Sequence, residues 1–193
     1  MAISREQKRE YVLTLVLGLV VICIALLIKI FIFQLYIVDG QSMENTLQDH
    51  DRLIVNKFPR TLGRLDGHAY IPKRGDIIVF SQDNLPGYVG QKQLIKRVIG
   101  EPGDHIVVQQ GKLTIYNSSH PKGYDPDTTA TYKVTTQETI GDGDWQLGPK
   151  QIFVMGDNRN NSEDSRYFGP VNLSQIVGHA DLRIYPLGET HRL

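Results

Sequence analysis

A long apolar run near the start of the chain precedes a region of shorter apolar segments. The run YVLTLVLGLVVICIALLI, residues 11–28, has no charged residue over 18 positions, and IFIFQLYIV continues it beyond Lys29. About 20 apolar residues are enough to cross the core of a bilayer as a helix. A secretory signal peptide is the alternative, but its apolar region has only about 7–15 residues and a small-residue cleavage site follows it. Large aromatic residues follow here, so we predict an uncleaved transmembrane anchor over residues 11–33.

The charges around this run predict how the chain crosses the membrane. Three basic residues precede the run within residues 1–10, whereas the next basic residue after Lys29 is Arg52. Lys29 lies near the end of the predicted helix, where its side chain can reach the interface. By the positive-inside rule, residues 1–10 are expected in the cytoplasm and residues 34–193 in an extracytoplasmic domain.

After the anchor, the pattern changes to short apolar segments separated by Gly, Pro, Asn and Asp. The segments are rich in β-branched and aromatic residues, as strands are, and the separators are typical of turns. They are DRLIVNKF, GDIIVFS, QLIKRVIG, HIVVQQ, KLTIY, QIFVMG and HADLRIYPL. A 3.6-residue apolar period of useful length is missing from this region, apart from a short turn at residues 172–177. We therefore predict a mostly β fold after the anchor.

Residues 117–144 differ from the rest of this region because they are polar and rich in turn-forming residues. Such a composition is typical of loops rather than of buried strands. We predict that they form an insertion or small cap on the β core, within an inserted region of residues 105–150. The sequence assigns little functional content to this segment.

Composition narrows the class of protein. A chain of 193 residues suits one domain with an appendage. Its 21 basic and 21 acidic side chains give a formal net charge of zero, which argues against a nucleic-acid partner bound through a broad basic surface. The single cysteine, Cys23, lies in the apolar run, so no disulfide framework or cysteine-based metal site is expected within one chain.

A lysine in one predicted strand has two interpretations. In QLIKRVIGEPGD, strand alternation places Leu94, Lys96 and Val98 on one face. Lys96 is then either part of a solvated Lys-Arg pair on an edge strand or a lysine buried among apolar neighbours. Burial lowers the pKa of a lysine and makes its neutral amine available as a general base. A serine hydroxyl needs such a base to become a nucleophile, and Ser42 in GQSMENTL is the candidate.

Histidine-based catalysis is the rival chemistry. The histidines are scattered, and His50, between Asp49 and Asp51, is the least implausible candidate for a base near Ser42. The sequence contains no Gly-x-Ser-x-Gly elbow and no His-x-x-x-His or Cys/His spacing typical of zinc sites. We therefore expect catalysis without histidine, without a metal and without a cofactor.

The order of the motifs resembles a known family. An anchor followed by GQSMENTL, GDIIVF, IKRVIGEPGD and VMGDNRNNSEDSR resembles the type I signal peptidases, which are membrane-bound serine endopeptidases. The resemblance extends over residues 37–186, and the last motif is the most specific. Taken alone, that motif would be a polar turn that bonds to itself. The short chain with one span resembles the Gram-positive bacterial form of the family.

The resemblance implies a role for each matching residue. Ser42 corresponds to the nucleophile and Lys96 to its general base, a Ser-Lys dyad. Ser162 corresponds to a serine that hydrogen-bonds and orients the lysine. The remaining supporting positions form two expected pairs, Asp157 with Arg97 and Asp164 with Arg166.

The resemblance also implies a fold, a substrate and a location. The expected fold is an antiparallel β-sheet catalytic core of the signal-peptidase type, with the substrate bound as an added strand. The expected reaction is removal of N-terminal signal peptides from secreted preproteins, after small residues at Ala-x-Ala-like sites. The expected location is the plasma membrane, where the enzyme would contact the lipid bilayer and, transiently, the secretion translocon.

Two positions depart from the family pattern. Asn45 stands where the family commonly has proline, which predicts a looser turn after the nucleophile. Gly40, two residues before Ser42, stands where some relatives supply a serine to the oxyanion hole. Stabilisation of the oxyanion is then expected to rely on backbone N–H groups, including that of Ser42.

Two other classes share part of this pattern. A catalytically silent, anchored paralogue would act as a binding protein, but its usual mark is loss of the serine or the lysine, and both are present. Self-cleaving repressors of the SOS response share the fold and the dyad, but they begin with a DNA-binding domain where this chain has an anchor.

Overall fold

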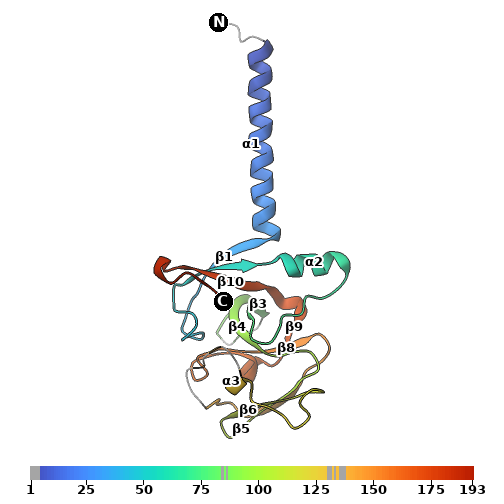
Figure 1. The fold of residues 1–193 in the computed structure, drawn as a ribbon, viewed down its shortest axis with the longest axis vertical. Helices are drawn as coiled ribbons and strands as arrows, with labels where there is room; N and C mark the ends of the chain where they lie inside the picture. Colours follow the sequence, from blue (N-terminus) through green and yellow to red (C-terminus); the bar gives the residue numbers. More distant parts are fainter. Residues whose placement is uncertain (1–4, 84, 86, 130–131, 133, 135–137) are drawn as a thin grey trace.

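The structure is a computed structural model that describes residues 5–193 except 84, 86, 130–131, 133 and 135–137. One long helix stands on a β-rich domain (Figure 1). The helices are α1 (Arg5–Phe31), α2 (Phe58–Asp66), α3 (Pro126–Thr129) and α4 (Ser165–Phe168), with 3-10 turns at Leu173–Gln175 and Leu187–Glu189. The strands are β1 (Phe33–Ile37), β2 (Arg52–Asn56), β3 (Ile77–Asp83), β4 (Gln91–Gly100), β5 (His105–Gln109), β6 (Lys112–Tyr116), β7 (Gly143–Gln146), β8 (Gln151–Met155), β9 (Val171–Asn172), β10 (Ile176–Tyr185) and β11 (His191–Arg192).

Helix α1 contains residues 11–31 of the predicted anchor. It has 27 residues, none of them buried, and among the described residues it is the one helix long and apolar enough to cross a membrane. The helix begins earlier than predicted because the polar residues from Arg5 onward extend it. It ends at Phe31 rather than continuing through IFIFQLYIV.

The end of the apolar run forms a strand, and the helix stops two residues before the predicted anchor boundary at residue 33. Strand β1 pairs antiparallel with β2, from Phe33 opposite Asn56 to Ile37 opposite Arg52. Its side chains alternate between exposed and half-buried, the period-two pattern of a strand. The apolar run therefore contains two elements, and its alternating last part pairs with the domain.

The main sheet is antiparallel, as the family resemblance predicted. Its strand order is β1-β2-β10-β3-β4-β8-β9, with β11 also paired to β10. Strand β10 lies between β2 and β3 and so joins the end of the chain to its first half. Two apolar cores form around this sheet, one including Met43, Leu47 and Val79 and the other including Phe80 and Val98.

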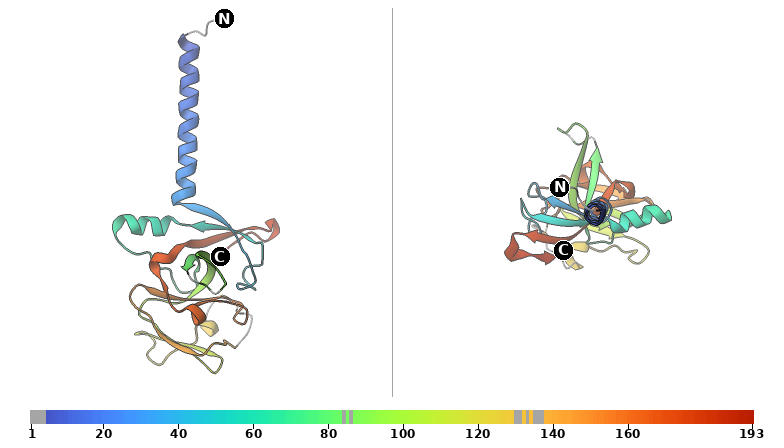
Figure 2. Two further views of the ribbon diagram at one scale, coloured as in Figure 1. Left: turned by 180° about the vertical axis from the view of Figure 1, so that it is seen from behind. Right: turned by 90° about the horizontal axis from the view of Figure 1, so that it is seen from above.

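A second, three-stranded sheet has the order β6-β5-β7 and lies at the end of the domain opposite α1 (Figures 1 and 2). Ile106 and Leu113 of this sheet pack with Ile99 and Phe153 of the main sheet in a third apolar core. The small sheet is thus joined to the main sheet by buried apolar contacts. Part of the predicted cap, residues 130–131, 133 and 135–137, lies outside the described residues.

Helix α2 was not predicted from the sequence. Pro59 lies in its first turn, where the missing N–H costs no hydrogen bond, and Gly67 ends it with a φ of 77°. Phe58, Leu62 and Leu65 are spaced as on one helical face, but the helix is only nine residues long and its apolar residues are exposed. The turn predicted at residues 172–177 is present as the 3-10 turn Leu173–Gln175.

Candidate active site

A groove of about 370 Å³ lies between the chain that leaves β1 and strand β4. One side is formed by residues 36–42 and the other by residues 92–96. Leu53 and Val79 lie at its base, and the exposed residues Asn161 and Glu163 complete its lining. The groove therefore brings together residues from all four sequence motifs.

Ser42 and Lys96 meet in this groove. The Nζ atom of Lys96 lies 2.7 Å from Oγ of Ser42, although 54 residues separate them in sequence. Ser42 belongs to a turn that Met43 and Leu47 anchor in the core, since both are fully buried. Gly40 enters this turn with a φ of 97°, a conformation that a side chain would strain.

Lys96 is buried, with only 4% of its surface exposed. Burial is the main cause that lowers its pKa, to about 8, because desolvation disfavours the ammonium form. Asp164 is the strongest of the carboxylates that oppose this change, and the nearby charge of Lys92 adds to it. A substantial fraction of Lys96 is therefore neutral at mildly alkaline pH, as a general base requires.

Ser162 lies close to Ser42 but does not form the expected hydrogen bond with Lys96. Its Oγ atom is buried and has no hydrogen-bond partner among the described residues. The second hydrogen bond of Lys96 goes instead to the carbonyl oxygen of Ile95, at 3.1 Å. The structure therefore does not show the expected direct hydrogen bond between Ser162 and Lys96, although one N–H of the ammonium is left for such a contact.

Asp157 and Arg97 form a buried bidentate ion pair. The Nε and Nη2 atoms of Arg97 donate to the two carboxylate oxygens of Asp157, at 2.8 and 2.6 Å. Thr46, four residues after Ser42, donates its hydroxyl to the same carboxylate at 2.5 Å. This pair therefore connects β4, the turn after β8 and the turn that carries Ser42.

Asp164 and Arg166 form a second bidentate pair, with both N–O distances at 2.8 Å. Asp164 is also the N-cap of α4, and it accepts a hydrogen bond from the backbone N–H of Gly156 at 3.0 Å. Arg166 donates to the carbonyl oxygen of Ile140 at 2.7 Å. The pair therefore holds the turn after β8 against the segment that precedes β7.

Arg159 and Asp127 belong to the same network, although the sequence pattern did not single them out. The guanidinium of Arg159 is fully buried; it donates to the Asp127 carboxylate and, at 3.1 Å, to the carbonyl oxygen of Gly156. Tyr132 hydrogen-bonds Asp127, and its ring lies 4.3 Å from the guanidinium carbon of Arg97. The segment that the sequence described as having little function thus contacts both buried pairs. Only the crowding of polar residues in VMGDNRNNSEDSR hinted at this.

The histidines lie apart from this arrangement. His50 is exposed and lies 3.4 Å from Asp49, and none of the residues described as lining the groove is a histidine. His179 is instead held between Asp76 and Asp181, and its hydrogen bond to Asp76 is the main cause that raises its pKa. Within the described ranges, no cluster of three or more His, Cys, Asp or Glu side chains could hold a metal ion.

Comparison with known proteins finds a matching family and several similar sequences. Residues 9–185 match the family described as "Signal peptidase, peptidase S26". A signal peptidase I from Bacillus caldolyticus is 37% identical over 174 residues, which cover 86% of this chain and 87% of the relative. Signal peptidase I S of Bacillus subtilis (strain 168) is 34% identical over 179 residues, 90% of this chain and 88% of the relative. A crystal structure of a signal peptidase I from Enterococcus faecalis is 28% identical, with a TM-score of 0.40 and coverage of 56% of this chain and 95% of its own.

Proposed function

Because this chain belongs to the signal peptidase family, peptidase S26, and is therefore a serine hydrolase, we propose that it removes signal peptides with Ser42 as nucleophile and Lys96 as general base. The observation that carries the proposal is the 2.7 Å distance between Lys96 Nζ and Ser42 Oγ. The low exposure of Lys96 supports it further, because burial favours the neutral amine that a base needs.

In the proposed reaction, neutral Lys96 takes the hydroxyl proton as Ser42 Oγ attacks the scissile carbonyl carbon. Backbone N–H groups, including that of Ser42, stabilise the oxyanion, since Gly40 has no side chain to contribute. Lys96 then gives the proton to the leaving amine of the mature protein, and an acyl-enzyme remains on Ser42. Water attacks this ester with Lys96 again as base, which releases the signal peptide with a new carboxyl end and restores Ser42.

The preprotein is proposed to bind beside β4 as an added strand. Residues 91–97 of β4 pair with β3, whereas the described pairing of β4 with β8 runs only from Arg97 to Gly100. The edge of β4 along residues 92–96 therefore faces the groove, where a peptide backbone can continue the sheet. Small residues are proposed at positions −1 and −3, as in the Ala-x-Ala sites that the family resemblance implies.

Incubation of the detergent-solubilised full chain with a preprotein that bears one Ala-x-Ala site tests the activity. Mass spectrometry of the products should show cleavage directly after the second alanine by the wild type and none by Ser42→Ala. Cleavage by the Ser42→Ala variant, or cleavage at unrelated bonds, would refute the assignment.

We further propose that the enzyme is anchored in the plasma membrane by α1, with residues 1–10 in the cytoplasm and the domain outside. The charge asymmetry around α1 and its apolar length support this arrangement. From the outside, the active site can reach preproteins held in the bilayer or emerging from the secretion translocon. Protease added to intact spheroplasts should digest the domain; protection until lysis would refute this orientation.

A further inference from the structure

A basic groove lies where α1 joins the domain. We define it by three cationic residues, Lys57, Arg60 and Arg64, which line a hollow of about 500 Å³. The apolar residues Ile30 and Phe31, from the last turn of α1, line the same hollow. A cationic site with apolar walls thus begins where the predicted membrane span ends.

The positive charge of the basic groove is not balanced within the described part of the chain. None of its three cationic side chains takes part in an ion pair there. The Nε atom of Arg60 is buried and has no hydrogen-bond partner among the described residues. Burial is the main cause that lowers the pKa of Lys57, and Arg60 adds to it. An anion in the groove would satisfy Arg60 and reduce the repulsion between these cations.

The groove has a fixed position relative to α1. The backbone N–H of Lys57 donates to the carbonyl oxygen of Ile32 at 2.7 Å, and its Nζ donates to that of Lys29 at 3.1 Å. The hydroxyl of Thr61 donates to the carbonyl oxygen of Phe31 at 3.0 Å. Helix α2 therefore satisfies the last carbonyl groups of α1 and lies across its end (Figure 1).

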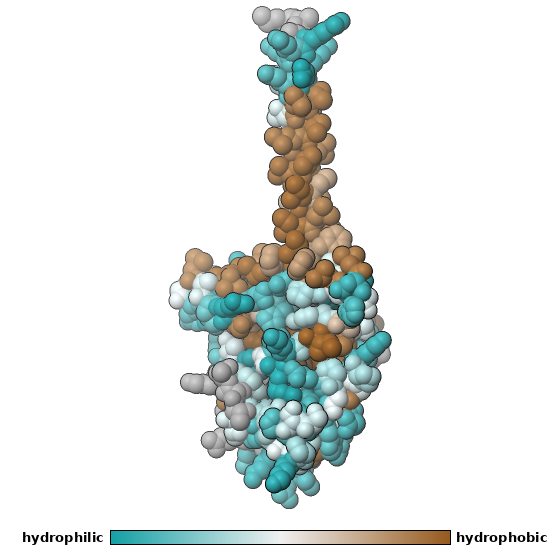
Figure 3. All heavy atoms as spheres, turned by 45° about the vertical axis from the view of Figure 1, so that its right-hand side comes forward, coloured by the Kyte–Doolittle hydropathy of each residue, from teal (hydrophilic) through white to brown (hydrophobic). Residues whose placement is uncertain are grey.

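An exposed apolar face of α2 lies beside the groove. Phe58, Leu62 and Leu65 share one side of the helix and are 50%, 48% and 81% exposed. Apolar surface also continues from α1 onto the adjoining rim of the domain (Figure 3). A short helix with a basic side and an apolar side is typical of segments that lie in the membrane interface.

We propose that the basic groove binds the phosphodiester headgroup of an anionic phospholipid in the leaflet that faces the domain. Arg60 and Arg64 contact the phosphate, because guanidinium groups form paired hydrogen bonds with its oxygens. The acyl chains lie along Ile30 and Phe31, while the apolar face of α2 enters the interface. The inference rests on the proposed membrane placement of α1. In this arrangement, α2 determines how far the domain lies from the bilayer.

Native mass spectrometry of the full chain in detergent tests the proposal, with phosphatidylglycerol and phosphatidylcholine titrated separately. The wild type should retain phosphatidylglycerol more tightly than phosphatidylcholine. Each basic side chain near an anionic lipid contributes about a factor of five, so Arg60→Gln/Arg64→Gln should weaken phosphatidylglycerol binding by about 25-fold. Arg64→Gln alone, at an exposed position, should weaken it about fivefold even if the double variant fails to fold.

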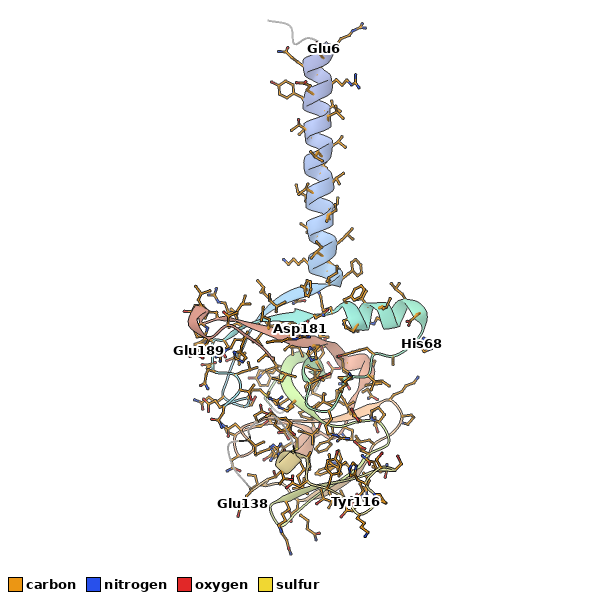
Figure 4. All side chains as sticks on the ribbon, viewed as in Figure 1. Glu6, His68, Tyr116, Glu138, Asp181 and Glu189 are labelled. Carbon is orange, nitrogen blue, oxygen red and sulfur yellow. The ribbon has the colours of Figure 1, made fainter. Side chains whose placement is uncertain are left out.

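Lys112→Gln/Lys122→Gln is the matched control, because it removes two exposed charges from the far end of the domain. The basic residues before the apolar run also attract anionic lipid, but they lie at the opposite end of α1, where Figure 4 shows Glu6, and are identical in all variants.

Equal affinity for the two lipids, or equal weakening in the control, would overturn the proposal. Displacement of phosphatidylglycerol by equimolar inorganic phosphate would also overturn it, since it would indicate a site for soluble anions. The readout does not require peptidase activity, so failure of the proposed catalytic function would leave this test intact.

Discussion

Gly156 packs directly against the backbone of Ser42. A Cβ atom added to Gly156 would lie 2.3 Å from the carbonyl oxygen of Ser42 and 2.3 Å from Oγ of Ser162. The backbone N–H of Asn158 donates to the same carbonyl oxygen at 3.0 Å. The end of β8 thus fixes the position of Ser42 through a contact for which only glycine has room.

Gly156→Ala is therefore expected to displace the turn that carries Ser42. Overpacking of this kind destabilises a fold by about 1–3 kcal/mol. A displacement of about 1 Å in a catalytic group costs roughly 100-fold in rate, so kcat/KM should fall by about that factor. Peptide cleavage and urea unfolding in detergent would measure both effects. Gly188→Ala is the control, because nothing lies within 4 Å of its added Cβ; a Gly156→Ala enzyme as active as this control would contradict the packing argument.

The pH dependence of cleavage should reflect the protonation state of Lys96, the proposed general base. With the pKa of Lys96 at about 8, kcat/KM should rise with pH and level off above that value, because only the neutral amine accepts a proton. Lys96→Arg should be inactive, since guanidinium does not lose its proton in this range. His50→Ala should cleave within a few-fold of the wild type, as His50 is exposed and makes its ion pair with Asp49.

Circular dichroism of both variants provides the folding control. An active Lys96→Arg enzyme, or an inactive but folded His50→Ala enzyme, would exclude the Ser42–Lys96 assignment. A rising limb centred near the ordinary lysine pKa of about 10.4 would show that burial does not activate the amine.

The burial of Lys96 should also reduce the stability of the folded enzyme. Its pKa falls from 10.5 unfolded to about 8 folded, so below about pH 8 the fold carries the full cost of a desolvated ammonium. A shift of this size corresponds to a cost on the order of 3 kcal/mol. Between about pH 8 and 10.5 the unfolded chain binds more protons than the fold, so this cost decreases as pH rises.

Lys96→Met keeps the volume of the side chain and removes the charge. We expect the variant to be inactive and more stable than the wild type near neutral pH, with an advantage that shrinks toward pH 10. Urea unfolding at about pH 7 and about pH 10 would measure the difference. An advantage that does not change with pH would show that the gain comes from packing rather than from desolvation.

The sequence predicted the strands whose apolar and turn-forming residues follow a recognisable pattern. The segments that contain β2, β3, β4 and β10 were recognised because runs rich in β-branched residues are separated by turn-forming residues. Strand β1 was not recognised as a strand because its apolar residues follow the span without a polar break, although all but Phe33 were assigned to the domain. Helix α2 was missed because a nine-residue helix with exposed apolar residues gives a weak periodic signal.

The site required information that periodicity does not contain. Alternation could place Lys96 on one face of a strand, and its chemistry made Ser42 a candidate partner, but only the family resemblance favoured this pairing over a solvated Lys-Arg pair. Arg159 and Asp127 are 32 residues apart, in two segments whose composition is that of ordinary polar turns. Their pairing depends on how the cap folds back on β8, which no local pattern specifies.

The Asp127–Arg159 pair leads to the last prediction. The Arg159 side chain is fully buried, and Asp127 supplies the carboxylate that compensates its charge. Removing one partner of a buried ion pair typically costs about 3–5 kcal/mol, because a buried charge is left uncompensated. Asp127→Asn should therefore destabilise the enzyme by roughly this amount. It should also lower kcat, since Arg159 holds the carbonyl oxygen of Gly156, a residue that packs against Ser42.

Asp144→Asn is the matched control, because Asp144 hydrogen-bonds His105 at an exposed position of the small sheet, where such polar contacts contribute about 0–1 kcal/mol. Urea unfolding would compare the stabilities of the two variants, and cleavage of a preprotein would be measured where each is fully folded. The expected result is a large loss of stability and of kcat in Asp127→Asn alone. If Asp127→Asn behaved like Asp144→Asn in both measurements, the cap would be attached to the catalytic core by its apolar contacts, and the buried pair would not position the turn beside Ser42.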